Sequence, residues 1–184
     1  MEQKNKDIAI STVAVIGAGT MGASIAGLIA SSGYKVHLFD LAREAPESRS
    51  HIAEKAVKEM YSRNMVLRSD DILKINACNL EDDLNQISDC QLVIECIVEQ
   101  LETKKQLYQS LLPYISGNAM LVSNTSTLPL EELVNGLPSS VAQRFAITHF
   151  FNPPRYMPLL ELVTSSNTDA SCVSVLKSFC DEQL

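Results

Sequence analysis

VAVIGAGTMG, residues 13–22, decides the fold of this 184-residue chain. Four apolar residues typical of a short buried strand lead into a G-x-G-x-x-G turn, and a helical pattern follows at once. In this context Gly17 permits the tight turn, Gly19 lets the backbone approach a pyrophosphate, and Gly22 lets the helix pack close to the strand. The amide groups at the start of the helix then hold the anion. The glycine pattern is a weak signal by itself, but after a strand and before a helix it predicts a dinucleotide site formed by Gly17, Ala18, Gly19, Thr20, Met21 and Gly22.

Asp40 indicates which dinucleotide binds. It closes the second apolar run, about 20 residues after the glycines, where a carboxylate meets the adenosine ribose hydroxyls. A carboxylate repels a 2′-phosphate, and Leu41 rather than an arginine follows it. We therefore predict NAD rather than NADP as the cofactor. The alternative is a strand-end aspartate in a turn that binds nothing.

Short apolar runs alternate with segments of helical period along the rest of the chain, which is typical of βαβ units. The expected fold is α/β: a Rossmann-type, doubly wound, mostly parallel sheet. The predicted strands cover residues 12–16, 35–39, 92–96, 120–123, 145–150 and 159–163, with a weaker one at 75–78.

Two segments between the strands are expected to be helical. Residues 101–115 form a sheet-covering helix on which Lys104 and Lys105 face away from the sheet. Residues 41–74 are too many for an ordinary loop, and apolar residues between Ile52 and Tyr61 recur at helical spacing. This pattern predicts a helical excursion after the second strand.

Composition excludes several classes of protein. The chain has 15 Lys and Arg against 22 Asp and Glu, a net charge of −7, and no basic cluster, so nucleic acid is not an expected partner. No apolar run approaches the roughly 20 residues of a membrane span, and the start MEQKNKDIAIST is neither a signal nor a transit peptide. We expect one domain, residues 1–184, in a cytoplasmic protein.

The cysteines and histidines do not predict a metal site. Five cysteines are scattered without C-x-x-C pairs, and the three histidines stand far from them in sequence. Cys96 ends an apolar run, and we expect a reduced thiol packed at a strand end.

His149 is the candidate for acid-base chemistry. It stands near the carboxyl end of a late predicted strand, the edge of an α/β sheet where ligands bind. Oxidising an alcohol with NAD needs a base for the hydroxyl proton, and histidine titrates near neutral pH. Glu161 lies in the next strand between apolar residues, so it is expected to alternate into a buried strand and to need a partner. If the two strands pair as a hairpin, Glu161 reaches His149 and fixes its tautomer. A histidine with a purely structural role is the alternative.

Ser126 belongs to a third polar patch, SNTST at residues 123–127, between a strand and a helix with Pro129 in its first turn. A helix N-cap explains part of this patch. Its hydroxyl groups also face the expected cofactor crevice, so Ser126 is a candidate to hydrogen-bond a substrate oxygen.

Taken together, GAGTMGASIA, VSNTSTLPLEEL and THFFNPPRYMPLLELV, in this order and spacing, resemble the N-terminal domain of 3-hydroxyacyl-CoA dehydrogenase. The resemblance extends from residue 8 to residue 181, and LVIECIVEQLETKKQLY adds a fourth block. It is most similar to the dehydrogenase module of large bacterial fatty-acid oxidation proteins.

The resemblance implies a role for each matching residue. Residues 17–22 and Asp40 would bind NAD, and Glu99, Lys104 and Asn152 match further cofactor contacts. Ser126 matches a serine that touches substrate and cofactor, His149 the catalytic base, and Glu161 its carboxylate partner. The implied reaction is NAD-dependent oxidation of L-3-hydroxyacyl-CoA to 3-ketoacyl-CoA in fatty-acid β-oxidation, with acyl-CoA as the substrate.

The chain also departs from the family pattern. Gln100 replaces a frequent asparagine, and the short excursion leaves Lys55, Lys58 and Arg63 as unaligned candidates for contacts to CoA. The family continues with a final strand, a D-x-P-G-F-x-x-N-R-type segment and an all-helical second domain, none of which this chain contains. We therefore expect weak or no turnover from residues 1–184 by themselves, and a homodimer only with the helical domain.

Two other functions remain open at this point. One is an NAD-binding module without turnover, because the fold is compatible with it. The other is a dehydrogenase of free β-hydroxy acids.

Overall fold

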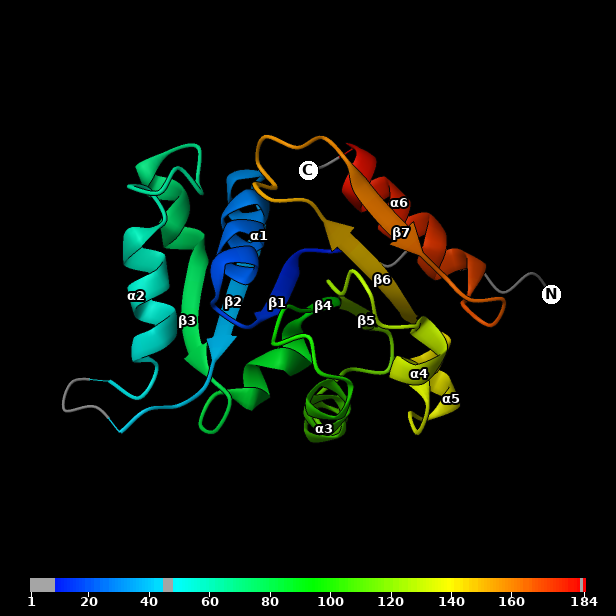
Figure 1. The fold of residues 1–184 in the computed structure, drawn as a ribbon. Helices are drawn as coiled ribbons and strands as arrows, with labels where there is room; N and C mark the ends of the chain where they lie inside the picture. Colours follow the sequence, from blue (N-terminus) through cyan, green and yellow to red (C-terminus); the bar gives the residue numbers. More distant parts are fainter. Residues whose placement is uncertain (1–8, 45–47, 183) are drawn as a thin grey trace.

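A seven-stranded sheet forms the centre of the computed structural model, which describes residues 9–44, 48–182 and 184 (Figure 1). Its order is β3-β2-β1-β4-β5-β6-β7, with β6 and β7 antiparallel and all other neighbours parallel. The strands are β1 (Thr12–Ile16), β2 (Lys35–Asp40), β3 (Ile75–Asn79), β4 (Leu92–Glu95), β5 (Met120–Ser123), β6 (Phe145–Phe150) and β7 (Leu160–Val163). The expected α/β, mostly parallel, Rossmann-type fold is confirmed, with strand ends within one residue of the predicted ones.

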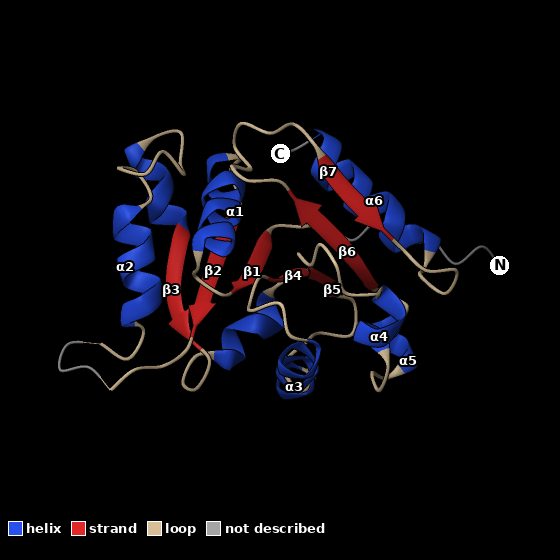
Figure 2. Ribbon diagram, viewed as in Figure 1, coloured by secondary structure: helices blue, strands red, loops and turns tan. Residues whose placement is uncertain are grey.

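Helices cover both faces of this sheet (Figure 2). They are α1 (Thr20–Ser31), α2 (His51–Glu59), α3 (Leu101–Leu111), α4 (Leu130–Val134), α5 (Ser139–Ala142) and α6 (Ala170–Glu182), with short 3-10 helices η1 (Ser69–Lys74) and η2 (Leu84–Asp89). Helix α3 ends earlier than the predicted residue 115, and Pro129 is the N-cap of α4 rather than a residue of its first turn. No helix in the described part of the chain is long and apolar enough to cross a bilayer.

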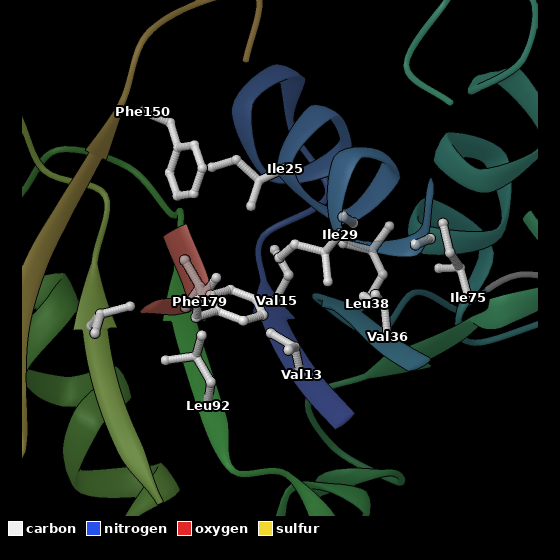
Figure 3. Packing of buried hydrophobic residues seen from close by; sticks show 14 of the residues in the cluster. Val13, Val15, Ile25, Ile29, Val36, Leu38, Ile75, Leu92, Phe150 and Phe179 are labelled. Carbon is white, nitrogen blue, oxygen red and sulfur yellow. The ribbon is translucent and has the colours of Figure 1, made fainter. Parts of the chain in front are cut away.

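Two apolar clusters hold the layers together. On one face, Ile25 and Ile29 of α1 pack over Val13 and Val15 of β1, and Phe179 of α6 joins them (Figure 3). The other cluster joins the opposite side of β1 to α3 and α4 through Ala14, Ile16, Tyr108, Leu111, Leu130 and Leu133. Strand β1 is therefore apolar at every buried position, as expected for a parallel strand covered on both faces.

The excursion after β2 is helical in part. Its ordered helix is α2, which buries Ala53, and the chain then turns at residues 60–68 before η1; residues 45–47 lie outside the described residues. A Cβ atom on Gly27 of α1 would lie 2.4 Å from the carbonyl oxygen of Met65, so a glycine is needed for this close approach. The Arg155 guanidinium donates to the carbonyl oxygens of Asn64 and Val66, at 3.0 and 2.9 Å. These contacts fasten the excursion to α1 and to the loop after β6.

Candidate functional site

The glycine turn between β1 and α1 is shaped by close backbone contacts. Gly17 has a φ of +105°, and its N–H donates to the Phe39 carbonyl at 2.8 Å. A Cβ atom on Gly17 would lie 2.6 Å from the carbonyl oxygen of Cys96, and one on Gly22 would lie 1.8 Å from that of Gly17. A Cβ atom on Gly19 would meet nothing within 4 Å. Two of the glycines are therefore needed to form the turn, whereas Gly19 faces open space beside it.

Asp40 fastens this turn to β2. Its Oδ2 accepts the N–H of Ala18 at 2.6 Å, and its Oδ1 accepts the N–H of Leu41 at 2.7 Å. A cavity of about 540 Å³ opens beside it, and its lining includes Gly17, Gly19, Asp40, Leu80, Ile97, Gln106 and Leu107. By helix geometry the amides of Thr20, Met21 and Gly22 precede the first intrahelical hydrogen bond, from Ala23 to Gly19 at 2.9 Å. These residues fit a dinucleotide: an open glycine at a helix start, a carboxylate at the end of β2, and an apolar slot between them.

His149 and Glu161 face each other across the β6–β7 hairpin. They are direct partners in the strand register, and His149 Nδ1 lies 2.9 Å from Glu161 Oε2. An ionised carboxylate accepts hydrogen bonds and donates none, so this contact favours the imidazole tautomer that carries its proton on Nδ1 and leaves Nε2 as the acceptor. The Phe151 ring packs on the imidazole, with ring centroids 4.5 Å apart. The hairpin thus holds a histidine whose Nδ1 is directed at a carboxylate.

The expectation that Glu161 alternates into a buried strand is wrong. The Glu161 side chain is 57% exposed and that of His149 is 21% exposed. Strand β7 is the edge of the sheet, and its residues are half-buried or exposed throughout. The partner of Glu161 is therefore set by the hairpin register and not by burial.

Ser126 shares a second cavity, of about 290 Å³, with the histidine and its carboxylate. The lining also includes Thr127, Leu130 and Ile147. Asn124 Oδ1 accepts the N–H of Phe150 at 2.9 Å, which ties the Ser126 loop to the strand that carries His149. Asn152 is exposed, just beyond β6, and is not among the residues described as lining this cavity. The structure thus brings Ser126, His149 and Glu161 together.

Lys104 is the clearest failure of the sequence pattern. It was expected to face away from the sheet, yet its side chain is 1% exposed and its Nζ lies 2.6 Å from Oε1 of Glu95, which is fully buried. Lys104 precedes Tyr108 by four residues and Leu111 by seven, so it occupies the buried stripe of α3. Glu95, missed at the sequence level, supplies the charge that makes a buried ammonium tolerable. The feature of the sequence that could have identified Glu95 was a carboxylate at the end of the fully apolar run LVI.

Glu99 connects this ion pair to the loop after β5. Its Oε2 lies 3.2 Å from Lys104 Nζ, and its Oε1 accepts hydrogen bonds from the hydroxyl groups of Thr125 and Thr127. Partial burial raises the pKa of Glu99, whereas the hydrogen bond from Thr125 and the charge of Lys104 lower it by more. The net pKa of this carboxyl lies below its ordinary value, so Glu99 is an anion at neutral pH.

The cysteines are free thiols, and Cys96 is half-buried just after β4, as expected. Burial raises the pKa of the Cys78, Cys90 and Cys180 thiols to about 12, and it raises that of Cys96 as well. At neutral pH these side chains are therefore protonated and poor nucleophiles.

A comparison with family models identifies the chain. The model described as "3-hydroxyacyl-CoA dehydrogenase, NAD binding domain" matches residues 12–183. The chain belongs to this family. The resemblance inferred from its motifs is confirmed, and NAD is the cofactor of the domain that it matches.

Several relatives of this 3-hydroxyacyl-CoA dehydrogenase domain are longer proteins. A putative fatty acid oxidation complex trifunctional enzyme of Rickettsia felis is 44% identical over 177 residues, which cover 95% of this chain and 25% of that protein. A probable 3-hydroxyacyl-CoA dehydrogenase of Deinococcus radiodurans is 34% identical, with 95% and 51% covered. The solved structure of 3-hydroxybutyryl-CoA dehydrogenase from Escherichia coli K12 superposes with a TM-score of 0.76 at 30% identity, covering 94% of this chain and 36% of that one. The chain thus spans between a quarter and about half the length of these proteins.

Proposed function

We propose that this chain is the NAD-binding and catalytic-histidine part of an L-3-hydroxyacyl-CoA dehydrogenase, which oxidises L-3-hydroxyacyl-CoA to 3-ketoacyl-CoA in fatty-acid β-oxidation. The observation that carries the proposal is the His149–Glu161 pair, 2.9 Å apart, in one cavity with Ser126 at the edge of the sheet that also holds the glycine turn. The names of the relatives support the substrate class.

The proposed reaction uses His149 as the base. Its Nε2 takes the proton of the 3-hydroxyl group while the hydrogen on C3 leaves as hydride and the C–O bond becomes a carbonyl. NAD, when bound, supplies the acceptor for that hydride. Glu161 stabilises the imidazolium that forms and holds the ring orientation. The Ser126 hydroxyl hydrogen-bonds the substrate oxygen.

The cofactor-binding residues are assigned to different parts of NAD. Residues 17–22 hold the pyrophosphate and Asp40 the adenosine ribose, and Oδ2 of Asp40 also accepts the N–H of Ala18 in the turn. For Glu99 and Lys104 we propose a role at the nicotinamide end: Lys104 lies beneath Glu99, and Glu99 holds the Ser126 loop. Asn152 is proposed to reach the nicotinamide side from the loop after β6.

A basic cavity beside the glycine turn supports CoA as the thiol carrier. About 440 Å³ in volume, it is lined by Ala18, Arg43, His51, Ile52, Lys55, Ala56, Glu59 and Arg63. Lys55 and Arg63 are proposed to bind CoA phosphates there, with Arg63 also paired to Glu59 at 2.9 Å. Lys58 is exposed on α2 and is not among the described lining residues, so it is the weakest of the three candidates.

The domain organisation is part of the proposal. Residues 1–184 would form one NAD-binding domain of a longer enzyme, with a helical domain supplying the second wall of the substrate cleft and the dimer contacts. Substrate positioning carries several kcal/mol of a barrier, roughly 7 to 11 in favourable cases, so the domain by itself is expected to bind NADH and to turn over poorly.

The test uses two proteins. One is this chain, and the other is a chimera in which the part of the Rickettsia felis relative that follows its matching segment is joined after Leu184. NADH binding is measured by fluorescence titration, and turnover by NADH oxidation with acetoacetyl-CoA. Binding in both proteins and turnover in the chimera support the proposal.

The same assay distinguishes the alternatives. NADH binding without turnover in either protein favours an NAD-binding module. Oxidation of free 3-hydroxybutyrate, in preference to the CoA thioester, favours a free β-hydroxy acid dehydrogenase. In the active chimera, His149→Gln is expected to abolish turnover and to leave NADH affinity nearly unchanged, and unchanged activity would refute the assignment of the base.

A further inference from the structure

Glu95 is a buried carboxylate whose every hydrogen-bonding direction is used. It is the last residue of β4 and is 0% exposed. Its Oε1 accepts from Lys104 Nζ at 2.6 Å and from the N–H of Ile97 at 2.8 Å. Its Oε2 accepts from the Tyr108 hydroxyl at 2.8 Å and from the Ser123 hydroxyl at 2.7 Å. Four donors, from α3, β5 and the loop after β4, therefore converge on one carboxylate.

The ammonium group of Lys104 links the buried carboxylate of Glu95 to Glu99. Because it is held by Glu95, its Nζ stays 3.2 Å from Oε2 of Glu99, whose side chain is 39% exposed. Glu99 Oε1 in turn accepts the backbone N–H groups of Ser126 and Thr127, at 3.2 and 3.4 Å. A continuous path of charged groups thus runs from the core to the backbone of the loop that presents Ser126.

We propose that Glu95 is a positioning residue that holds the Ser126 loop through Lys104 and Glu99. The effect on the loop is a property of the folded chain itself, whereas an effect on turnover rests on the proposed function. Glu95 lies beneath the site and does not line the cavity described around Ser126 and His149.

The charges explain why a carboxylate is needed. Two anions, Glu95 and Glu99, share one buried cation, Lys104, and a buried ammonium without its partner is strongly disfavoured. With Glu95 replaced by Gln, the shape and the contacts to Tyr108 and Ser123 are kept, because these hydroxyl groups can also accept. The counter-charge is lost, so Lys104 moves toward Glu99 and solvent, and the Glu99 carboxylate no longer stays below the loop amides.

The direct test is amide hydrogen exchange of this chain, with no cofactor or substrate present. In Glu95→Gln we expect exchange at Ser126 and Thr127 to be faster by roughly tenfold or more, with the amide of Val15 in β1 unchanged. Unchanged exchange at Ser126 and Thr127 would overturn the proposal.

A matched control is Asp71→Asn. Asp71 is also a buried carboxylate, 2% exposed, with Lys74 Nζ 2.9 Å away and a backbone donor at Arg68, but it lies in η1, away from the site. The Asp71→Asn variant should leave amide exchange at Ser126 and Thr127 unchanged. Equal acceleration in both variants would mean a general loss of stability and would also overturn the proposal.

A second variant covers the case in which Glu95→Gln does not fold. Glu95→Gln combined with Lys104→Met removes both buried charges, and a neutral pair in place of a buried ion pair is often tolerated. The same faster exchange at residues 126 and 127 is expected, and wild-type exchange in the double variant would contradict the role of the path.

Turnover of the active chimera provides the second test. Glu95→Gln is expected to lower kcat roughly tenfold or more, to change the KM for acetoacetyl-CoA and NADH less than about twofold, and to leave the pH optimum unchanged, because His149 and Glu161 are intact. An unchanged kcat, or a shifted pH optimum, would contradict positioning. If the wild-type protein does not turn over, the proposed function fails, and the exchange experiment still decides the role of Glu95.

Discussion

The glycine turn and the β6–β7 hairpin lie at the same edge of the sheet but are built in opposite ways. In the turn, geometry is set by backbone contacts so close that a Cβ atom on Gly22 would lie 1.8 Å from the Gly17 carbonyl oxygen. In the hairpin, the strand register places two side chains opposite each other, and a hydrogen bond joins His149 to a glutamate that is 57% exposed.

This difference matches what each region would have to do in the proposed reaction. A pyrophosphate is bound by backbone amides, so its site is as rigid as the core around it. A catalytic histidine must gain and lose a proton, so it needs a partner of fixed geometry rather than a fixed charge state. Substitutions in the turn should therefore damage stability, and substitutions in the hairpin should damage turnover.

The largest expected effect is in the turn. Gly22→Ala places a methyl group against a carbonyl oxygen that cannot move without opening the β1–α1 connection, so we expect a loss of at least about 3 kcal/mol of unfolding free energy. Urea unfolding followed by circular dichroism measures it.

Gly19→Ala is the control within the same turn. Gly19 has φ −68° and ψ −174°, which any residue adopts, and an added Cβ atom meets nothing within 4 Å. We expect a loss below about 1 kcal/mol in stability but a large loss of NADH affinity. A fold damaged as badly as by Gly22→Ala would show that rigidity is not specific to the buried glycines.

The second prediction concerns the hairpin. Glu161→Gln removes the charge that stabilises the imidazolium, so kcat in the active chimera should fall by roughly 100-fold. Thermal stability should change little, because ion pairs at exposed positions contribute about 0 to 1 kcal/mol. Glu132→Gln, an exposed glutamate of α4 outside the described cavity lining, should have no effect. A retained kcat in Glu161→Gln would remove Glu161 from the mechanism.

The two regions also differ in how well the sequence predicts them. The turn, Asp40 and every strand follow from local patterns, because buried parallel strands are mostly apolar and glycine spacing reflects backbone geometry. The pairing of His149 with Glu161 follows from assuming a hairpin, and the register confirms it.

What the sequence does not predict is burial that depends on a partner far along the chain. Hydrophobic periodicity predicts that Lys104, as a polar residue, is exposed. Its burial depends on the ion pair with Glu95, which lies in another element. Likewise, the residues of β7 do not reveal that β7 is an edge strand, which leaves Glu161 exposed. Both errors arise because a residue's environment is set by tertiary contacts and not by its own segment.

The third prediction concerns the inner side of the hairpin. Thr148 of β6 is 2% exposed, and within the described residues its Oγ1 is buried without a hydrogen-bond partner. Thr148→Val keeps the shape and removes this hydroxyl, so we expect a gain of about 1 kcal/mol in unfolding free energy. The measurement is a higher urea midpoint at an unchanged m-value.

Thr168→Val is the matched control, since the Thr168 hydroxyl is bonded to the Phe145 carbonyl at 3.3 Å and to the N–H of Ser165 at 3.0 Å. That variant should be destabilised. Destabilisation of both variants would mean that the Thr148 hydroxyl is satisfied in solution.

The smallest expected effect concerns Glu99, which connects the buried network to the loop of Ser126. Its pKa lies below the ordinary value, so its stabilising contacts are fully present above the unfolded-state pKa of about 4.3 and are lost as the pH falls through the lower folded-state pKa. The effect is small because the Glu99 side chain is 39% exposed and solvent screens its charge. Carbon-13 NMR of the Glu99 carboxyl should give a midpoint below about 4.3. Thr127→Val removes one donor and should raise that midpoint. If the Glu99 midpoint does not change in Thr127→Val, the carboxylate and the loop of Ser126 are not coupled. The loop would then be independent of the buried network.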